Sequence, residues 1–293
     1  HSQLKVWTVV GSITNEKLME RIFAEHQPDY AFHAAAYKHV PMMEDNPAIA
    51  VQNNIYGTRV IADLAVKYHT KKFVMISTDK AVNPTNVMGC SKRICEIYCQ
   101  SLNQAIVEGK VKGITQFVTT RFGNVLGSNG SVIPLFRKQI HEGGPVTVTH
   151  PDIIRYFMLI PEACKLVLEA GTMGKGGEIF VFDMGEPVRI VDLAQRMITL
   201  SHAQNVKIEF TGLREGEKLY EEVLNDKEDS IPTIHPKIMV AKVREYDYAV
   251  ACANEERLLE ASNTFDDMVI VQVMKEIVPE YKSMASKYNV LDK

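Results

Sequence analysis

The sequence predicts an α/β protein built on a doubly wound parallel sheet, with a smaller mixed α/β lobe attached to it. Two observations lead to this prediction. Short apolar runs such as 73–76 alternate with long amphipathic segments such as 86–108, a pattern typical of βαβ units with right-handed crossovers. Beyond about residue 130 this alternation weakens and the segments shorten. We therefore expect one domain over 1–130 and a smaller lobe with a C-terminal extension over 131–293.

The elements of the first half each have a local signal. An alternating apolar stretch over 4–10 ends at a glycine, and an Asn cap precedes an amphipathic helix over 16–25. An apolar strand is expected over 30–33. A long helix over 46–68 contains Asn and Gly residues, which lower its intrinsic stability. Their presence indicates a helix face that packs closely against something specific.

The second half gives shorter and less regular signals. Pro232 and Pro236 favour an extended chain ahead of the last helix. The expected strands or extended segments are 114–122, 145–149, 155–160, 178–183 and 206–210, and the expected helices are 133–140, 161–169, 190–200 and 267–281.

Composition excludes several functional classes. Among the 293 residues, 46% are hydrophobic and 24% charged, ordinary values for a globular protein. A net charge of −3 gives no electrostatic basis for binding nucleic acid or for a polybasic membrane anchor. The five cysteines lack metal-site spacing, so we expect free thiols and no metal. No apolar run approaches the ~20 residues that span a bilayer, so we expect a cytoplasmic protein.

The polar residues that follow two predicted strands indicate a ligand site. In an open α/β sheet, ligands bind beyond the carboxyl ends of the strands. The strand over 73–76 runs directly into hydroxyl, carboxylate and ammonium groups at 77–80, although a solvated turn would also have this composition. Small residues at 34–36 follow the strand over 30–33 and would let a flat ligand approach the backbone. A plain tight turn explains that second segment equally well.

Four motifs in order resemble one family. They are HAAAYKHVPMME at 33–44, STDKAVNPTNVMGCSKR at 77–93, RFGNVLGSNGSVIPLF at 121–136 and GLREGEKLYEE at 212–222. With them the chain resembles the extended short-chain dehydrogenase/reductases, over about residues 9–240. Within that superfamily it is similar to the capsule-type UDP-N-acetylglucosamine 4,6-dehydratases of bacterial polysaccharide and glycan synthesis. The resemblance implies an NAD-binding Rossmann domain over 1–130 and a substrate-binding lobe over 131–293.

Two departures from the superfamily pattern stand out. The usual Tyr-x-x-x-Lys pair is Met88-x-x-x-Lys92, as in the long, membrane-associated branch of the dehydratases, and Met has no titratable proton. The glycine-rich turn that binds the dinucleotide pyrophosphate is absent, and Ser12 replaces a usual Asp. We expect that the chain begins after the first βαβ unit and that a full-length form carries membrane helices upstream. It would then be the cytoplasmic domain of an inner-membrane protein; loss of the NAD site is the alternative.

The resemblance implies an internal redox dehydration of UDP-N-acetylglucosamine to a UDP-4-keto-6-deoxy-HexNAc, with NAD as the cofactor. Asp79 would be the acid for the C6 hydroxyl and Lys80 the base at C5. Lys80 would then need a pKa below its usual value of ~10.4, and we expect burial and the charge of Lys92 to lower it. The implied catalytic residues are Thr78, Asp79, Lys80, Met88 and Lys92.

The resemblance also implies binding residues for the two ligands. Those for NAD are Ala34, Ala35, Ala36, Lys38, Asn54 and Lys92; those for the UDP-sugar are Asn124, Ser131, Val132, Arg214 and Glu217. A plain surface role for Arg214 stays open, and three histidines are expected to be structural: His33, His39 and His235. Homo-oligomerisation is expected from the family. Two other functions fit parts of the sequence, a UDP-sugar 4-epimerase and a non-catalytic UDP-sugar-binding pseudoenzyme.

Overall fold

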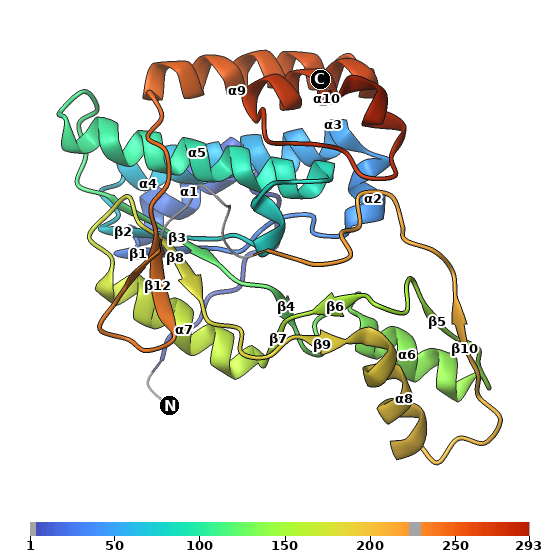
Figure 1. Ribbon diagram of the computed structural model, residues 1–293. Helices are drawn as coiled ribbons and strands as arrows, with labels where there is room; N and C mark the ends of the chain where they lie inside the picture. The colour runs from blue at the N-terminus through green and yellow to red at the C-terminus, as the bar shows by residue number, and fades with distance from the viewer. Residues whose placement is uncertain (1–3, 223–229, 293) are drawn as a thin grey trace.

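A six-stranded sheet forms the centre of the structure (Figure 1). The computed structural model describes residues 4–222 and 230–292. Along the sheet the order is β1-β2-β3-β8-β12-β11; the first four strands are parallel, and β12 and β11 are antiparallel additions. The strands are β1 (Tyr30–His33), β2 (Lys72–Ile76), β3 (Gln116–Arg121), β8 (Ile179–Phe182), β11 (Ser230–Pro232) and β12 (Ile238–Ala241).

Helices cover both faces of the sheet, which confirms the doubly wound prediction. Helices α1, α4 and α5 lie on one face of the sheet, and α7 lies on the other (Figure 1). Helices α9 and α10 form a further layer over α5. The helices are α1 (Glu16–His26), α4 (Gly57–Lys67), α5 (Val87–Val107), α7 (Ile160–Met173), α9 (Tyr248–Ser262) and α10 (Asp267–Ile277). Within the part of the chain that the structure describes, no helix is both long and apolar enough to span a membrane.

A smaller lobe projects beyond the carboxyl ends of the parallel strands (Figure 1). It has its own apolar core, in which Phe136, Val146 and Ile190 are buried together. The lobe and the links to it contain α6 (Val132–His141), α8 (Ile190–Leu200), β4 (Asn124–Val125), β5 (Val146–Val148), β6 (Ile154–Arg155), β7 (Phe157–Met158), β9 (Val188–Arg189) and β10 (Ile208–Phe210). Strands β8, β11 and β12 come from beyond residue 130 and return to the sheet, so the two-domain division stays a prediction.

The long helix expected over 46–68 is interrupted by a π-helix. It consists of α3 (Pro47–Ala50), η1 (Val51–Tyr56) and α4. The π turn places Asn54 in a fully buried position, where its amide bonds the Tyr37 N–H (2.8 Å), the Tyr37 carbonyl (3.0 Å) and Ser91 Oγ (3.0 Å). The expected close packing of this helix is therefore confirmed, and the π turn serves to fix the segment after β1.

The N-terminal stretch and the C-terminal helices lie outside the central sheet and differ in structure. The alternating stretch at 4–10 forms no strand, and Val10 is 94% exposed, because alternation alone does not provide a neighbouring strand to pair with. In the C-terminal region the sequence predicts at least one helix, over 267–281; the structure has α10 there and α9 ahead of it. Asp247 caps α9 by accepting from the Val250 N–H at 3.0 Å, and the helix is rich in Ala, Glu and Leu, which favour helices.

Candidate active site

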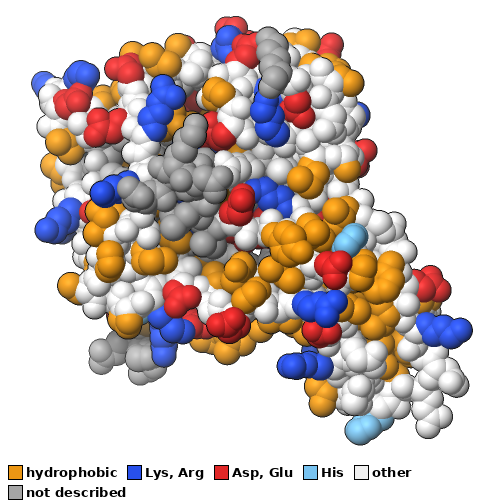
Figure 2. Space-filling view, viewed as in Figure 1, with side chains coloured by type: hydrophobic (Ala, Val, Ile, Leu, Met, Phe, Trp, Pro, Cys, Tyr) orange, Lys and Arg blue, Asp and Glu red, His pale blue; other side chains and the backbone are white. Residues whose placement is uncertain are grey.

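The carboxyl ends of β1, β2 and β3 open into one cleft of about 450 Å³ between the sheet and the small lobe. Residues of all four family-like motifs line it. Lys and Arg side chains are interspersed with Asp and Glu on the face drawn in Figure 2. Because residues at the carboxyl ends of these strands line the cleft, it coincides with the ligand site predicted at this edge of the sheet.

Thr78, Asp79 and Lys80 form a hydrogen-bonded group at the end of β2. Lys80 is held in the short 3-10 helix η2 (Asp79–Ala81), which Thr78 caps. Asp79 Oδ1 accepts from Thr78 Oγ1 at 2.8 Å and from Lys80 Nζ at 3.0 Å. The Asp79 side chain is fully buried, and its Oδ2 has no hydrogen-bond partner among the described residues. The structure thus places a buried carboxylate in direct contact with the ammonium of Lys80, which lines the cleft together with Thr78; Asp79 itself is not among the lining residues.

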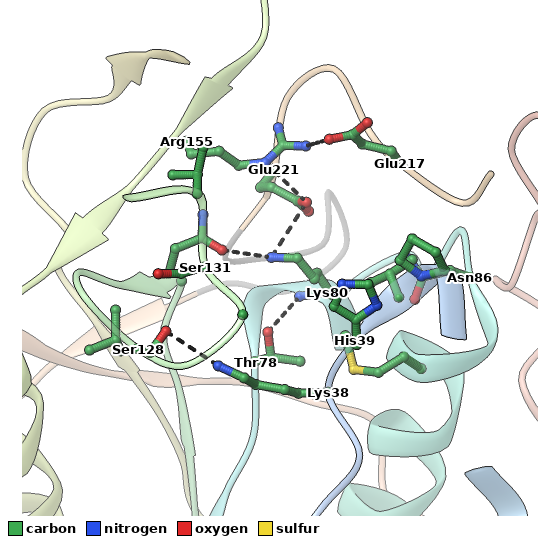
Figure 3. Close-up of a pocket in the computed structure, with 18 of the residues that line it drawn as sticks. Lys38, His39, Thr78, Lys80, Asn86, Ser128, Ser131, Arg155, Glu217 and Glu221 are labelled. Atoms are coloured by element: carbon green, nitrogen blue, oxygen red, sulfur yellow. Dashed lines mark hydrogen bonds and ion pairs between the residues drawn. The ribbon is translucent and has the colours of Figure 1, made fainter. Parts of the chain in front are cut away.

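The charge state of Lys80 differs from the expectation. Its Nζ also lies 3.4 Å from Asn124 Oδ1 and 3.5 Å from Glu221 Oε1 (Figure 3). Burial disfavours the ammonium, but the charges of Asp79 and Glu221 outweigh burial and the opposing charge of Arg155, so the pKa of Lys80 lies above its usual value. The expectation of a lowered pKa is wrong for this arrangement, because the carboxylates that face Lys80 outnumber the cations.

Lys92 and Met88 lie on α5 beside this group, and both line the cleft. Lys92 Nζ donates to the Ile76 carbonyl at 2.9 Å, so it points back to the end of β2. Burial lowers the pKa of Lys92. An ammonium has three donors, and the described residues supply this one acceptor, which leaves donors for ligand hydroxyl groups.

The segment after β1 forms another wall of the cleft. Ala34 and Ala36 line it with small side chains, and Lys38 Nζ reaches across to Ser128 Oγ at 3.3 Å (Figure 3). Asn54 lies behind this wall and holds its backbone. Small side chains, the free donors of Lys92 and a cation at the rim fit the nicotinamide and ribose part of a dinucleotide.

Residues from the small lobe complete the cleft. Asn124 and Val132 line it, and Ser131 is the N-cap residue of α6. Ser131 Oγ is buried without a hydrogen-bond partner among the described residues, and it makes no cap hydrogen bond. A buried hydroxyl at a helix N-terminus is suited to a polar or anionic ligand group. The structure therefore brings Asn124, Ser131 and Val132 together with the end of β2.

Arg214 and Glu217 also line the cleft. Glu217 is already bonded within the protein: Oε2 accepts from the Arg214 N–H at 3.1 Å, and Oε1 lies 3.3 Å from Arg155 Nη2 (Figure 3). The Arg214 side chain is exposed. Arg155 and Glu221 are cleft residues that the sequence did not predict. Glu221 belongs to the GLREGEKLYEE motif, so its position in the sequence could have indicated a site residue. Arg155 lies outside all four motifs, and no sequence pattern indicated it.

A buried ion-pair cluster lies beneath the site, which we call the Glu96 cluster: Glu96, Arg121, Arg93 and Ser77. Glu96 Oε1 accepts from Ser77 Oγ (2.7 Å) and Arg121 Nε (2.8 Å), and Oε2 accepts from Arg121 Nη2 (2.7 Å) and Arg93 Nη1 (3.0 Å). Burial would raise the pKa of Glu96, but the two guanidinium groups and Ser77 lower it to about 2. The cluster joins α5 to the ends of β2 and β3.

His33 confirms its expected structural role. Its Nε2 lies 2.8 Å from Thr58 Oγ1, and burial together with the charge of Lys92 lowers its pKa to about 3. The imidazole is therefore neutral at physiological pH. It packs against the Phe73 ring with a centroid distance of 5.7 Å, as a core residue does.

Gly216 fixes the loop that carries Arg214 and Glu217, and its replacement gives a testable prediction. Its φ is +72°, and a Cβ there would meet Asn86 Cβ at 2.5 Å. We expect Gly216→Ala to lower the free energy of unfolding by more than the roughly 1–3 kcal/mol that left-handed strain alone costs, because the Cβ clash adds to it. Gly212→Ala is the matched control, because φ is +85° there but nothing lies within 4 Å. Urea unfolding measures both; equal losses would contradict the steric argument.

Comparison with known proteins identifies the family. A family model described as "Polysaccharide biosynthesis protein" matches residues 1–243. The chain is 54% identical over 240 residues to the capsular polysaccharide biosynthesis protein CapD of Staphylococcus aureus, covering 81% of this chain and 39% of CapD. It is 49% identical over 280 residues to the probable polysaccharide biosynthesis protein EpsC of Bacillus subtilis, covering 91% of this chain and 46% of EpsC. The chain thus spans less than half the length of these relatives.

A solved structure agrees with this assignment. The X-ray structure of Pen from Bacillus thuringiensis superposes with a TM-score of 0.74 at 36% identity, covering 82% of this chain and 74% of Pen. The fold is that of the extended short-chain dehydrogenase/reductases. The chain belongs to the polysaccharide biosynthesis protein family.

Proposed function

We propose that this chain performs the NAD-dependent 4,6-dehydration of UDP-N-acetylglucosamine to a UDP-4-keto-6-deoxy-HexNAc in bacterial polysaccharide or glycan synthesis. One observation carries the proposal: Lys80 lines the cleft, and its Nζ lies 3.0 Å from Oδ1 of Asp79, which is buried directly behind it. Elimination of water needs an acid for the leaving hydroxyl and a base for the adjacent carbon-bound proton. Epimerisation at C4 does not need this pair.

The contact between Asp79 and Lys80 would supply the acid and the base of the elimination together. Transfer of one proton from Nζ to Oδ1 converts the ion pair into a carboxylic acid and a free amine, with no change in net charge. The amine of Lys80 then accepts the C5 proton, and the acid of Asp79 donates its proton to the departing C6 hydroxyl. Thr78 donates to the same carboxylate at 2.8 Å, so it orients Asp79 and is a candidate partner for the C4 oxygen.

NAD, when bound, would accept a hydride from sugar C4 and return it at C6. Two fold neighbours were solved with NAD, a UDP-glucose 4-epimerase of Thermus thermophilus and a dTDP-glucose 4,6-dehydratase of Streptomyces venezuelae, both with a TM-score of 0.63. In this chain Lys92 would donate to the nicotinamide ribose and Met88 would pack beside it. The remaining proposed cofactor residues are Ala34, Ala35, Ala36, Lys38 and Asn54.

The UDP-sugar would lie between the end of β2 and the small lobe. Asn124 and Ser131 offer polar groups beside Lys80, and Val132 adds apolar contact. The exposed Arg214 guanidinium would neutralise a pyrophosphate, and Glu217 would accept from ribose hydroxyls. A homo-oligomer is expected from the family and stays a prediction.

Mass spectrometry of UDP-N-acetylglucosamine after incubation with the chain and NAD⁺ tests the proposal. We expect loss of one water and, in D₂O, uptake of one deuterium at C5. An unchanged mass with a new C4 epimer would make the protein an epimerase. A second arm uses the chain with a glycine-rich strand–turn–helix unit added ahead of residue 1. Unchanged substrate in both arms would refute dehydration and favour a binding protein without catalysis.

A further inference from the structure

Glu221 is a buried carboxylate that the proposed reaction leaves without a role. It comes from the segment that follows Arg214 and Glu217, and it points into the cleft beside Lys80 (Figure 3). Its residue is 8% exposed, and Oε2 has no hydrogen-bond partner among the described residues. A buried carboxylate is costly unless a cation compensates it. The cations that face it are therefore informative.

Two cationic side chains form ion pairs with Glu221 Oε1. Lys80 Nζ is 3.5 Å away and Arg155 Nε is 3.8 Å away. Arg155 is held by other groups: Nη1 donates to the Ile154 carbonyl at 2.7 Å, and Nη2 donates to the Lys218 carbonyl at 2.8 Å. Arg155 thus fixes the position of Glu221, while the ammonium of Lys80 has fewer fixed partners.

Lys80 is consequently placed between two carboxylates on different parts of the fold. Asp79 lies on η2 at 3.0 Å, and Glu221 lies on the segment from the small lobe at 3.5 Å. The other polar or charged groups that face Lys80 are Asn124 on β4 and Arg155 on β6. Only one of the two carboxylates is needed as the acid for water loss.

We propose that Glu221 is a positioning residue that holds the ammonium of Lys80 opposite Asp79. The effect of Glu221 on catalysis rests on the proposed function, whereas its effect on the position and charge of Lys80 does not. In the elimination, Lys80 becomes an ammonium when it takes the C5 proton, while Asp79 gives its proton away. Glu221 supplies a fixed negative charge for that ammonium, independently of the state of Asp79. Its carboxylate also keeps Nζ on the side of the cleft that the small lobe closes.

Competitive labelling of lysine amines tests the inference without requiring turnover. The protein is treated with trace acetic anhydride at a series of pH values, and acetylation of Lys80 is measured by peptide mass spectrometry against the exposed Lys165. Glu221→Gln keeps the shape and removes the charge. We expect its Lys80 labelling curve to move to lower pH, with labelling several-fold higher than in the wild type near neutrality. This sign follows because the charge of Glu221 favours the ammonium.

Two variants separate the charge of Glu221 from other effects. Glu222→Gln is the matched control, because Glu222 is the next residue but pairs with Lys218 at 2.9 Å, and its labelling curve should match the wild type. Glu221→Asp retains the charge and should fall between the wild type and Glu221→Gln. An unmoved curve in Glu221→Gln, or an equal shift in Glu222→Gln, overturns the proposal.

The outcome remains decisive if a variant fails to fold or turnover is absent. In the wild type, the Lys80 labelling curve should lie at higher pH than the ordinary lysine pKa of ~10.4, and a curve at lower pH would contradict the proposal. Where the dehydration is observed, the rate of Glu221→Gln should rise at lower pH than that of the wild type, with kcat changed more than KM. A shifted labelling curve without any water loss would support Glu221 and refute the proposed function.

Discussion

Replacement of Asp79 by Asn is expected to lower the dehydration rate by about 10²–10⁴-fold, the usual contribution of a positioned acid or base. An amide has nearly the shape of the carboxylate, but it cannot take the proton from Lys80 or pass one to the C6 hydroxyl. The fully buried side chain can keep its place beside Thr78 and Lys80. The initial rate of formation of the dehydrated sugar, followed by mass spectrometry, measures the effect.

Lys80→Met should give a loss of similar size, because it removes the base. If the two residues act as one proton-exchanging unit, the double variant should be scarcely slower than either single variant. Asp152→Asn is the control, since Asp152 is an exposed carboxylate of the small lobe that pairs with Arg189 at 3.5 Å. Multiplied losses in the double variant would show that the two groups act independently. An undiminished rate in Asp79→Asn would remove Asp79 from the reaction.

The parts of the site that are local in sequence could be predicted. Thr78, Asp79 and Lys80 follow β2 directly, and Lys92 follows on the next helix, so strand polarity and helical spacing place them at one sheet edge. The parallel sheet and its helices were likewise predictable from alternating apolar runs. These features depend on neighbouring residues, which a sequence pattern records.

The electrostatic environment of Lys80 could not be predicted from the same pattern. Its partners Glu221 and Arg155 are distant in the chain, and they reach the cleft only because the small lobe folds over the sheet. The cation expected to lower its pKa, Lys92, instead donates to the carbonyl of Ile76. The π turn at Asn54 could not be predicted for a similar reason, because Asn54 bonds the backbone of the segment after β1, which a local sequence pattern does not record.

The Glu96 cluster carries the largest expected stability effect. Glu96 is fully buried and faces two guanidinium groups, so Glu96→Gln would remove the carboxylate shared by Arg93 and Arg121, although Arg93 keeps Glu280 at 3.3 Å. We expect this variant to lose about 3–5 kcal/mol of unfolding free energy at pH 7, the usual cost of breaking a buried ion pair. Urea unfolding followed by circular dichroism measures the loss. Glu108→Gln, at the exposed end of the same helix, should change stability little.

The same cluster predicts how stability depends on pH. The pKa of Glu96 is about 2 in the folded protein, below its ordinary value of 4.5. A carboxylate whose pKa is depressed on folding stabilises the protein above its unfolded pKa and loses that contribution as the pH falls toward the folded value. The difference in stability between the wild type and Glu96→Gln should therefore be constant above about pH 5 and shrink between pH 4.5 and 2. A difference that stays the same down to pH 2 would mean that packing, and not the charge of Glu96, holds α5 against the ends of β2 and β3.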